Sequence, residues 1–301
     1  MADITGYFAP DGFIAELQHE LGADALETHS RLVLARGAPR DVAWAANVWL
    51  EPQRLSIASI GDAAKQLRAI QRNWALYPLG HHRRAALIAE KLPKVSARPL
   101  AFGDPAPAAP LGSWCLVDAE TMLASASCAS PFPNGEANFV EDRALPSRAY
   151  LKLWEAFTVL GTQPRRGETC LDFGASPGGW SYVLGKLGTR VIAVDKAPLD
   201  PRVLALPGVA QRRTSAFSLA PRDIGPVDWL FSDVVCYPKR LLALVEKFLA
   251  AGTVRNFLCT IKFQGETDFA TQARFAAIPG SRLLHLHANK HELTWVKLSP
   301  S

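Results

Sequence analysis

Hydrophobic and polar residues alternate along residues 169–195 in a pattern that predicts a strand, a glycine-rich turn, a helix and a second strand. Residues 169–173 form a short apolar run, residues 180–187 carry apolar side chains at helical spacing, and residues 190–195 are rich in β-branched residues. An aspartate lies at the end of each predicted strand. The pattern is typical of the first βαβ unit of a nucleotide-binding α/β sheet.

The alternation continues toward the C-terminus. Further strands are predicted over residues 209–213, 227–233, 257–261, 283–287 and 293–298. Helices are predicted over residues 238–250 and 266–277, and a helix over 152–160, with Ser147 as its cap, precedes the first strand. Because helices separate the strands, we expect a mostly parallel sheet whose ligands bind at the carboxyl ends of its strands.

The first part of the chain has shorter elements. Strands are predicted over residues 4–8, 32–35 and 55–60, and helices over residues 10–21 and, capped by Asp62, up to residue 71. Residues 99–110 (PLAFGDPAPAAP) are rich in proline and alanine, which is typical of a linker. Two strands are predicted after them, over residues 113–117 and 121–127. We therefore expect a small α+β domain over 1–98, a linker with connecting strands over 99–146, and a Rossmann-like domain over 147–301. The strands within 113–128 could also belong to the first domain.

The glycine-rich turn suggests the chemistry of its ligand. Gly174, Gly178 and Gly179 do not follow the G-x-G-x-x-G order that places a pyrophosphate on a helix N-terminus. A cofactor with adenosine and no phosphates fits better, so we expect S-adenosylmethionine (AdoMet), with Asp195 holding its ribose. The alternative is an ordinary βαβ turn without a ligand.

A rival motif overlaps the same turn. Residues 174–178 (GASPG) match the G-x-S-x-G elbow of α/β-hydrolases. That elbow needs a backbone N–H after the serine to stabilise the oxyanion, and Pro177 has none. The hydrolase hypothesis is rejected on this ground.

Composition limits the remaining classes. The chain has 301 residues, of which 49% are hydrophobic and 20% charged, and it contains no apolar run long enough to span a membrane. Its start lacks the pattern of a signal peptide, and its five cysteines are far apart without a CxxC motif. These features predict a cytoplasmic protein with reduced thiols, no membrane association and no bound metal.

Basic residues are unevenly distributed. Residues 148–301 hold 20 lysines and arginines against 12 acids, whereas residues 1–147 hold 13 against 16. Within the first part, residues 65–98 nevertheless hold eight basic residues and one acid, interspersed with Trp74, Tyr77 and the pair His81–His82. Cations can contact phosphates and flat rings can stack on bases, so this basic tract, residues 65–98, is a candidate RNA-binding surface. A solvated helix face with aromatic core residues is the alternative.

Four charged residues stand out at the predicted strand ends. Asp233 and Lys262 end two of the strands, Glu292 comes just before the last strand, and Lys152 lies on the helix that leads into the first. A lysine can take a proton from a poorly acidic hydroxyl only if its own pKa is lowered, for instance by a neighbouring cation and partial burial. Carboxylates can orient the ammonium groups and stabilise a positively charged methyl donor. For each residue alone, a surface ion pair is the alternative.

The segments DFGASPGGW, VIAVD, SD at 232–233, IKF and HELTWV resemble the FtsJ (RrmJ) group of ribose 2′-O-methyltransferases. Within that group, ASPFPNGEANF, LPSRAYLKLWEAF and FSDVVCYPKRLLALVEKFL are most similar to the RlmM type, whose members methylate a cytidine ribose of bacterial 23S rRNA. The resemblance covers about residues 113–301. It implies an AdoMet-binding Rossmann-like sheet and an RNA partner, 23S rRNA or a large-subunit precursor.

The resemblance also implies roles for individual residues. Lys152, Asp233, Lys262 and Glu292 would form a catalytic tetrad, with Lys262 as the base. The implied cofactor wall comprises Asp172, Gly174, Ala175, Ser176, Pro177, Gly178, Gly179, Trp180, Asp195 and Asp233.

Two departures from the family pattern remain. The wider group often carries an acid after the third strand, near the adenine, where this chain has Arg213-Thr-Ser-Ala216, so Ser215 or the backbone would take that role. The first 98 residues match the RNA-binding, THUMP-like region of the RlmM type only weakly. A ribose of tRNA or of an mRNA cap is therefore an alternative substrate. A non-catalytic RNA-binding protein is a further alternative, although all four tetrad residues are present.

Overall fold

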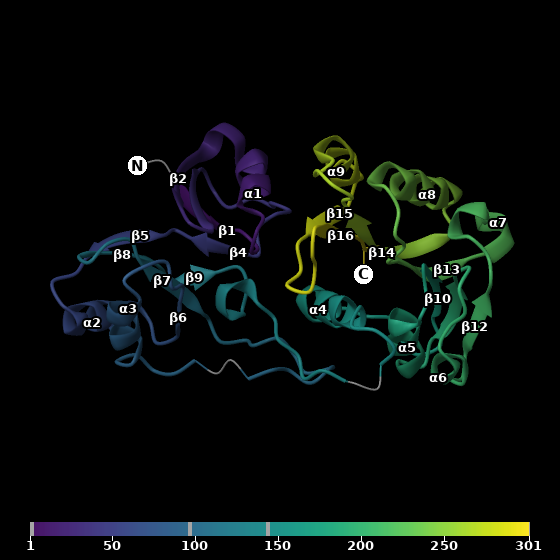
Figure 1. Ribbon diagram of the computed structural model, residues 1–301, viewed down its shortest axis with the longest axis horizontal. Coiled ribbons are helices and arrows are strands. Elements are labelled where there is room, and N and C mark those ends of the chain that lie inside the picture. The colour runs from purple at the N-terminus through teal and green to yellow at the C-terminus, as the bar shows by residue number, and fades with distance from the viewer. Residues whose placement is uncertain (1–2, 96–97, 143–144, 301) are drawn as a thin grey trace. The chain divides into compact units, whose positions relative to one another are not determined.

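The computed structural model describes residues 3–95, 98–142 and 145–300, and the chain divides into two compact units, residues 1–140 and 141–301. Each unit has its own sheets and its own helices (Figure 1). Among the described residues, every helix is too short or too polar to cross a membrane.

The first unit is an α+β domain with two sheets. Its elements are β1 (Ile4–Phe8), α1 (Ile14–Leu21), β2 (Ala25–His29), β3 (Leu32–Arg36), β4 (Asn47–Leu50), β5 (Gln53–Ser56), α2 (Ile60–Ile70), β6 (Trp74–Leu76), α3 (His82–Ala89), β7 (Gly112–Leu116), β8 (Thr121–Ser125) and β9 (Ser127–Cys128). One sheet has the strand order β2-β3-β1-β4-β9 and the other β5-β8-β7-β6. Helices α2 and α3 pack on the second sheet, where Leu67, Ile88 and Trp114 share one core (Figure 1).

The segment between residues 99 and 140 belongs to this unit. Strands β7 and β8 form an antiparallel pair, β8 also pairs with β5, and β9 pairs with β4. The proline-rich linker itself has no helix or strand, but Leu100 forms an isolated parallel bridge with Phe139. The strands within residues 113–128, which the sequence could not assign to one domain, thus belong to the sheets of the first unit.

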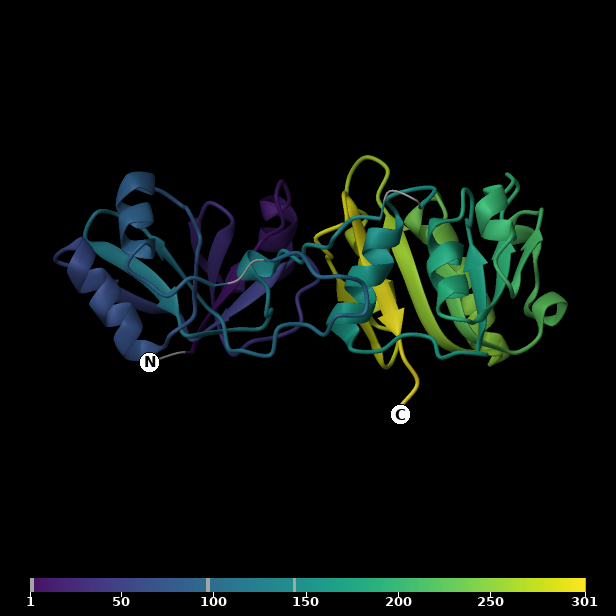
Figure 2. The same cartoon turned by 90° about the horizontal axis from the view of Figure 1, so that it is seen from below.

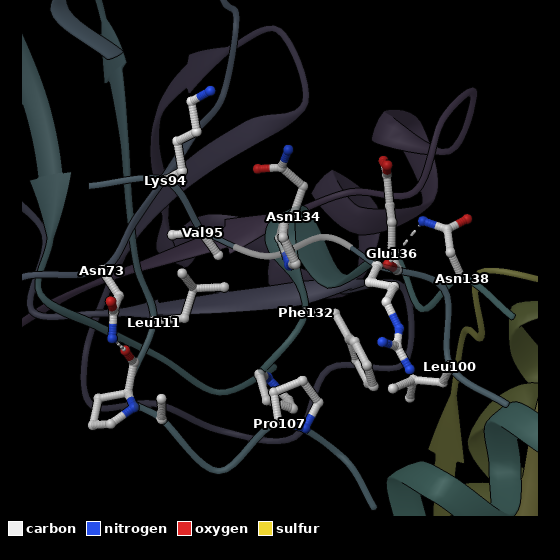
Figure 3. Close-up of a pocket in the computed structure, with 15 residues that line it drawn as sticks. Asn73, Lys94, Val95, Leu100, Pro107, Leu111, Phe132, Asn134, Glu136 and Asn138 are labelled. Carbon is white, nitrogen blue, oxygen red and sulfur yellow. Dashed lines mark hydrogen bonds between the residues drawn. The ribbon is translucent and has the colours of Figure 1, made fainter. Parts of the chain in front are cut away.

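A pocket of about 390 Å³ opens between this linker and residues 131–138. Figure 3 shows Phe132 and Pro107 on its apolar side, while the polar ends of Lys94, Asn134 and Glu136 point the same way. Residues of the linker therefore form one wall of this pocket.

Several predictions of local structure for this unit were wrong. Residues 55–60 do not form one strand, because β5 ends at Ser56 and α2 begins at Ile60. Ser59, and not Asp62, caps α2: its hydroxyl accepts a hydrogen bond from the backbone N–H of Asp62 at 3.1 Å. The Asp62 carboxylate instead accepts from the N–H of Ala58, so both residues satisfy backbone donors at the start of the helix.

The second unit is a Rossmann-like α/β domain, as the sequence predicted. Its elements are α4 (Tyr150–Leu160), β10 (Thr169–Phe173), α5 (Gly179–Lys186), β11 (Arg190–Val194), α6 (Pro201–Leu204), β12 (Val209–Arg212), α7 (Pro221–Ile224), β13 (Val227–Ser232), α8 (Pro238–Ala251), β14 (Val254–Lys262), α9 (Phe269–Ala276), β15 (Ser281–Leu284) and β16 (Glu292–Lys297). The sheet has the order β12-β11-β10-β13-β14-β16-β15. The first five strands in this order are parallel, and β16 runs antiparallel to both of its neighbours.

Helices cover both faces of this sheet. Figures 1 and 2 show α4, α5 and α6 on one face and α7, α8 and α9 on the other. Aromatic side chains fill both layers: Phe173, Phe231 and Phe248 are each at most 1% exposed. The parallel strands therefore all present their carboxyl ends at one edge, and the antiparallel β16 brings its first residue, Glu292, to that same edge opposite Lys262.

Candidate active site

Four charged side chains meet at the carboxyl edge of the sheet. The Lys152 Nζ lies 2.9 Å from Asp233 Oδ1 and 2.8 Å from Glu292 Oε1, and Lys262 Nζ lies 3.1 Å from the same Asp233 oxygen. These four residues, the tetrad, come from α4, the end of β13, the end of β14 and the start of β16. The side chains are only 9–18% exposed. The chain of alternating charges thus forms a nearly buried network.

The two lysines of the tetrad have different surroundings. Burial lowers the pKa of Lys152, but the negative charges of Asp233 and Glu292 outweigh burial and raise its pKa above the ordinary value. Lys152 is therefore held as a cation between two carboxylates. Lys262 has one carboxylate partner at ion-pair distance among the described residues, and it lines an adjoining hollow.

That hollow has a volume of about 390 Å³ and lies beside the glycine-rich turn. Its lining includes, from the predicted cofactor wall, Asp172, Gly174, Ala175, Ser176, Pro177, Gly179, Trp180, Asp195 and Asp233. Ser147, Ala149, Val234, Val235 and Lys262 complete it. The predicted cofactor residues and one lysine of the tetrad therefore border a single cavity.

The glycines of the turn are required first by packing. A Cβ on Gly174, whose φ is +77°, would lie 2.6 Å from the Val234 Cα, and one on Gly179 would lie 2.6 Å from the Ser147 hydroxyl. Gly178 is outside the lining, and a Cβ there would clash with Val203. Packing against Val203 therefore accounts for a glycine at 178, and the predicted cofactor role of Gly178 stays a prediction.

The two aspartates of the βαβ unit have distinct environments. Asp195 is partly exposed; its Oδ2 accepts a hydrogen bond from the Ser176 N–H and its Oδ1 accepts one from the Ala197 N–H. Asp172 is 1% exposed and accepts a hydrogen bond from the Ser181 hydroxyl at 2.6 Å. Burial raises the pKa of Asp172 to about 7 despite that hydrogen bond. Asp195 is therefore the accessible carboxylate, and Asp172 fixes the start of α5.

Helix α4 holds the loop that leads to Glu292. The Glu155 carboxylate, one turn after Lys152, accepts hydrogen bonds from the backbone N–H groups of His287 and Ala288 at 2.6 and 2.9 Å. Burial raises the pKa of Glu155 to about 7, although these two hydrogen bonds act in the opposite direction. The Asn289 amide also donates to the Glu292 carbonyl at 3.1 Å. The role of Glu155 was not predicted. An acid among the apolar residues of a helix could have indicated it, because a buried carboxylate needs hydrogen-bond donors.

The structure contradicts the predicted role of Ser147 and leaves that of Ser215 a prediction. Helix α4 begins at Tyr150 without a side-chain cap, so Ser147 does not cap it. The Ser147 side chain lies against Gly179 and lines the hollow instead. Ser215 caps a short 3-10 helix, Ala216–Ser218, through the Phe217 N–H and is outside the described lining of the hollow, so its role near the adenine stays a prediction. Val234 and Val235 were not predicted as site residues, because apolar residues after a strand carry no recognisable signal.

The aromatic part of the basic tract faces inward. Trp74 and Tyr77 are 5% and 6% exposed, and the Trp74 indole donates to the backbone carbonyl of Leu67. The prediction that these two rings could stack on bases is therefore wrong, because they fill the cores of the first unit. His81, His82 and Arg83 remain exposed, and together with Arg84 they line a second hollow of the unit.

The second unit therefore combines a Rossmann-like fold with a buried charged network at the carboxyl edge of its sheet. Residues 145–263 match the family model of FtsJ-like methyltransferases. Lys152, Asp233 and Lys262 lie within the matched residues, and Glu292 follows them.

Relatives of known name share this part of the chain. "Ribosomal RNA large subunit methyltransferase M" of Halorhodospira halophila is 38% identical over 134 residues, which is 44% of this chain and 39% of the relative. The protein of the same name from Alkalilimnicola ehrlichii is 33% identical over 192 residues, 60% of this chain and 53% of the relative. The solved structure of TrmN from Thermus thermophilus is 16% identical, covers 98% of this chain and 99% of its own, and has a TM-score of 0.38. The matches to the two relatives named for ribosomal RNA thus span about half of their length or less.

Proposed function

We propose that this chain is an AdoMet-dependent methyltransferase that methylates a ribose 2′-hydroxyl of RNA, with a cytidine of 23S rRNA as its target. The observation that carries the proposal is the tetrad beside the hollow. Ion pairs at 2.8–3.1 Å link two lysines and two carboxylates from four separate elements at the edge where α/β sheets bind ligands.

The residues around the hollow suit AdoMet. Its volume of about 390 Å³ lies within the usual range for small-molecule sites. Each Asp195 oxygen accepts one backbone hydrogen bond and retains a lone pair for the hydroxyls of a ribose. AdoMet supplies a methyl group on a positively charged sulfonium, which a nearby carboxylate such as Asp233 stabilises.

The residues of the tetrad have different roles in the proposed reaction. Lys262 takes the proton of the 2′-hydroxyl, because it borders the hollow and has a single carboxylate partner among the described residues. Lys152 stays protonated between Asp233 and Glu292 and keeps both carboxylates in place. Asp233 contacts both lysines and therefore orients Lys262 toward the hollow.

The RNA substrate is supported by the named relatives and by the charge of the chain. The relatives are named as methyltransferases of large-subunit ribosomal RNA, and residues 148–301 carry a clear excess of basic residues. We infer the ribose 2′-oxygen as acceptor from the tetrad, because a paired lysine and carboxylate network suits a hydroxyl proton. A tRNA or mRNA-cap ribose would use the same tetrad. The THUMP-like character of the first unit and the cytoplasmic location stay predictions.

One experiment tests both the reaction and the target. Total RNA from a strain lacking this chain is incubated with the purified protein and radiolabelled AdoMet, and 2′-O-methyl groups are then mapped by nucleotide. We expect a single new 2′-O-methylcytidine in 23S rRNA with the wild-type protein and none with Lys262→Ala. A methyl group on a base would contradict the proposed chemistry, and one on tRNA would contradict only the target. Binding of RNA without any transfer would indicate a non-catalytic protein.

A further inference from the structure

Two exposed apolar side chains follow Asp233 directly. Val235 and Tyr237 are 73% and 66% exposed, and no other large hydrophobic residue in the described ranges reaches these values. Soluble proteins rarely leave neighbouring large apolar side chains in water unless the patch contacts a ligand or a partner. Their position four residues or fewer from a member of the tetrad makes a functional contact the stronger explanation.

The backbone that carries these side chains is fixed on both sides. Val234, before them, packs on Gly174 so closely that a Cβ on the glycine would lie 2.6 Å from the Val234 Cα. Cys236, between them, is 7% exposed, and Tyr237 is the N-cap of α8, with its carbonyl accepting from the Arg240 N–H at 2.9 Å. The loop is therefore held rigidly while two of its side chains face solvent.

The loop also borders the site of the proposed reaction. Val235 lines the same hollow as Asp233 and Lys262. In a nucleotide, the base is attached to the carbon next to the one that bears the 2′-hydroxyl. A ribose placed with its 2′-oxygen at Lys262 therefore has its base close to the rim of this hollow. Val235 lines the hollow, and Tyr237 follows it two residues later in the chain.

Basic residues continue from this loop into α8. Lys239 and Arg240 are exposed on its first turn, and the Arg240 guanidinium lies 3.8 Å from the centre of the Phe217 ring. A cation held over a ring keeps its orientation and can still contact a phosphate. Apolar side chains followed by two cations are complementary to a nucleotide, which has a flat base and an anionic phosphate.

We propose that Val235 and Tyr237 form a ledge, named here the base ledge, on which the base of the methylated nucleotide rests, with the Tyr237 ring stacked on it. The inference rests on the proposed function and adds the residues that contact the base. The charge of the neighbouring residues favours RNA over a second copy of the chain as the occupant.

The test measures binding of labelled single-stranded RNA by fluorescence anisotropy, in the presence of S-adenosylhomocysteine (AdoHcy). The probes are a short oligocytidylate and a ribose-phosphate chain of the same length without bases. We expect Tyr237→Ala to weaken oligocytidylate binding by about 5- to 150-fold, the range for losing one stacked base. Binding of the base-free chain should not change, and Tyr237→Phe should retain wild-type affinity because the ring remains.

Matched variants and a second readout separate this inference from the proposed function. Val159→Ala removes a side chain that is 47% exposed on α4 and should leave both affinities unchanged. Equal losses on both probes, or none, with Tyr237→Ala would overturn the base ledge, and so would a change in oligomeric state alone. If that variant binds and methylates RNA like the wild type, the base ledge fails and the proposed function stands. If the base-dependent loss occurs but the wild type methylates no RNA, the proposed function fails while the base ledge stands as an RNA contact.

Discussion

Lys262 is the residue on which the proposed chemistry depends most directly. Replacing it with alanine should lower turnover by about two to four orders of magnitude, the usual span for a general base. Lys262→Arg should be similarly inactive, because a guanidinium keeps its proton and cannot accept another. Single-turnover methyl transfer with the wild type and the two variants measures both effects.

The control for Lys262 is cofactor binding. Both variants should bind AdoHcy nearly as well as the wild type, since the turn and Asp195 are unchanged. An arginine variant with near wild-type turnover would mean that this position supplies only charge, and the base would then have to be another group.

Asp195 provides a separate test of the cofactor site. Asp195→Ala should weaken AdoHcy binding by about 1–3 kcal/mol, as expected when hydrogen bonds to a charged group are removed. The same change removes the acceptor of the Ser176 and Ala197 N–H groups, so part of the loss would come from the turn itself. Asp200→Ala is the matched control, because this carboxylate bonds to Arg202 and is outside the described lining of the hollow. Calorimetry that detects NAD binding but no AdoHcy binding would contradict the cofactor assignment.

At the scale of single residues, the sequence predicted which residues lie at strand ends better than it predicted what individual side chains contact. Asp233, Lys262 and Glu292 could be placed together because they adjoin strands whose ends share one edge. The packing role of Gly178 against Val203 could not be predicted, because Val203 lies on another helix and only the fold brings the two together. Trp74 likewise gave no sign of its burial, since aromatic residues occur both in cores and at RNA-binding surfaces.

At the scale of elements, α4 organises one side of the site. Lys152 pairs with Glu292, and Glu155, one turn later, holds the backbone of the loop that precedes Glu292. One helix therefore fixes both the side chain and the approach of β16. The sequence predicted this helix and the strand, but the contact between Glu155 and residues 287–288 spans more than 130 positions of the chain and has no local signature.

The burial of Glu155 predicts a pH-dependent stability. Its pKa is raised to about 7 in the folded state, so between about pH 4.5 and 7 the folded state holds a proton that the unfolded state has released. Its contribution to the free energy of unfolding is therefore fully present at low pH and disappears as pH rises through 7. Glu155→Gln abolishes the titration. Between pH 4.5 and 7, the wild type should lose on the order of 3 kcal/mol of unfolding free energy relative to this variant.

Comparing variants at each pH isolates this one group. His285, whose pKa burial lowers to about 4, and Asp172 titrate equally in both proteins and cancel. Glu246→Gln serves as the control, because this carboxylate is 48% exposed and pairs with Arg274 at the surface. Urea unfolding monitored by tryptophan fluorescence gives the free energies. A difference that stays constant across this pH range would mean that Glu155 is ionised throughout.

The elements of the second unit were predicted more accurately than those of the first. Long apolar runs alternate with amphipathic helices from residue 169 onward, and each predicted strand there overlaps an observed one. In the first unit, β2, β4, β6 and α3 were not predicted; β6 has only three residues, too few to show a period. The strands β7 and β8 were predicted, but their partners β6 and β5 lie 38 or more residues earlier in the chain. The local pattern therefore could not show which domain these two strands complete.

At the scale of the whole molecule, two units with separate cores divide the chain. The second unit contains the tetrad and the hollow, so we expect the reaction to depend on it alone for its chemistry. The first unit carries most of the basic tract on its surface. We expect the first unit to contribute to RNA affinity and to the choice of target. RNA-binding measurements can test this contribution without a methyl-transfer assay.

The last prediction concerns the basic hollow of the first unit. Arg83 and Arg84, with His81 and His82, line this hollow at the start of α3. Replacing both arginines with alanine should weaken RNA binding and flatten its dependence on salt, because the variant neutralises fewer phosphates and so releases fewer counterions. The slope of log affinity against log salt should fall by about 0.7 for each phosphate of single-stranded RNA that is no longer neutralised. Anisotropy titrations over a range of salt concentrations measure it.

The matched control removes the same charge elsewhere in the unit. Arg36 and Arg54 are exposed and lie outside the described lining of this hollow, so their double alanine variant should keep the wild-type affinity and slope. AdoHcy binding should be unchanged in both double variants, because the cofactor residues all belong to the second unit. If the variant at Arg83 and Arg84 matches wild type in affinity and in slope, the basic hollow is only a solvated surface. RNA affinity would then have to come from the second unit, because residues 148–301 carry an excess of basic residues and residues 1–147 do not.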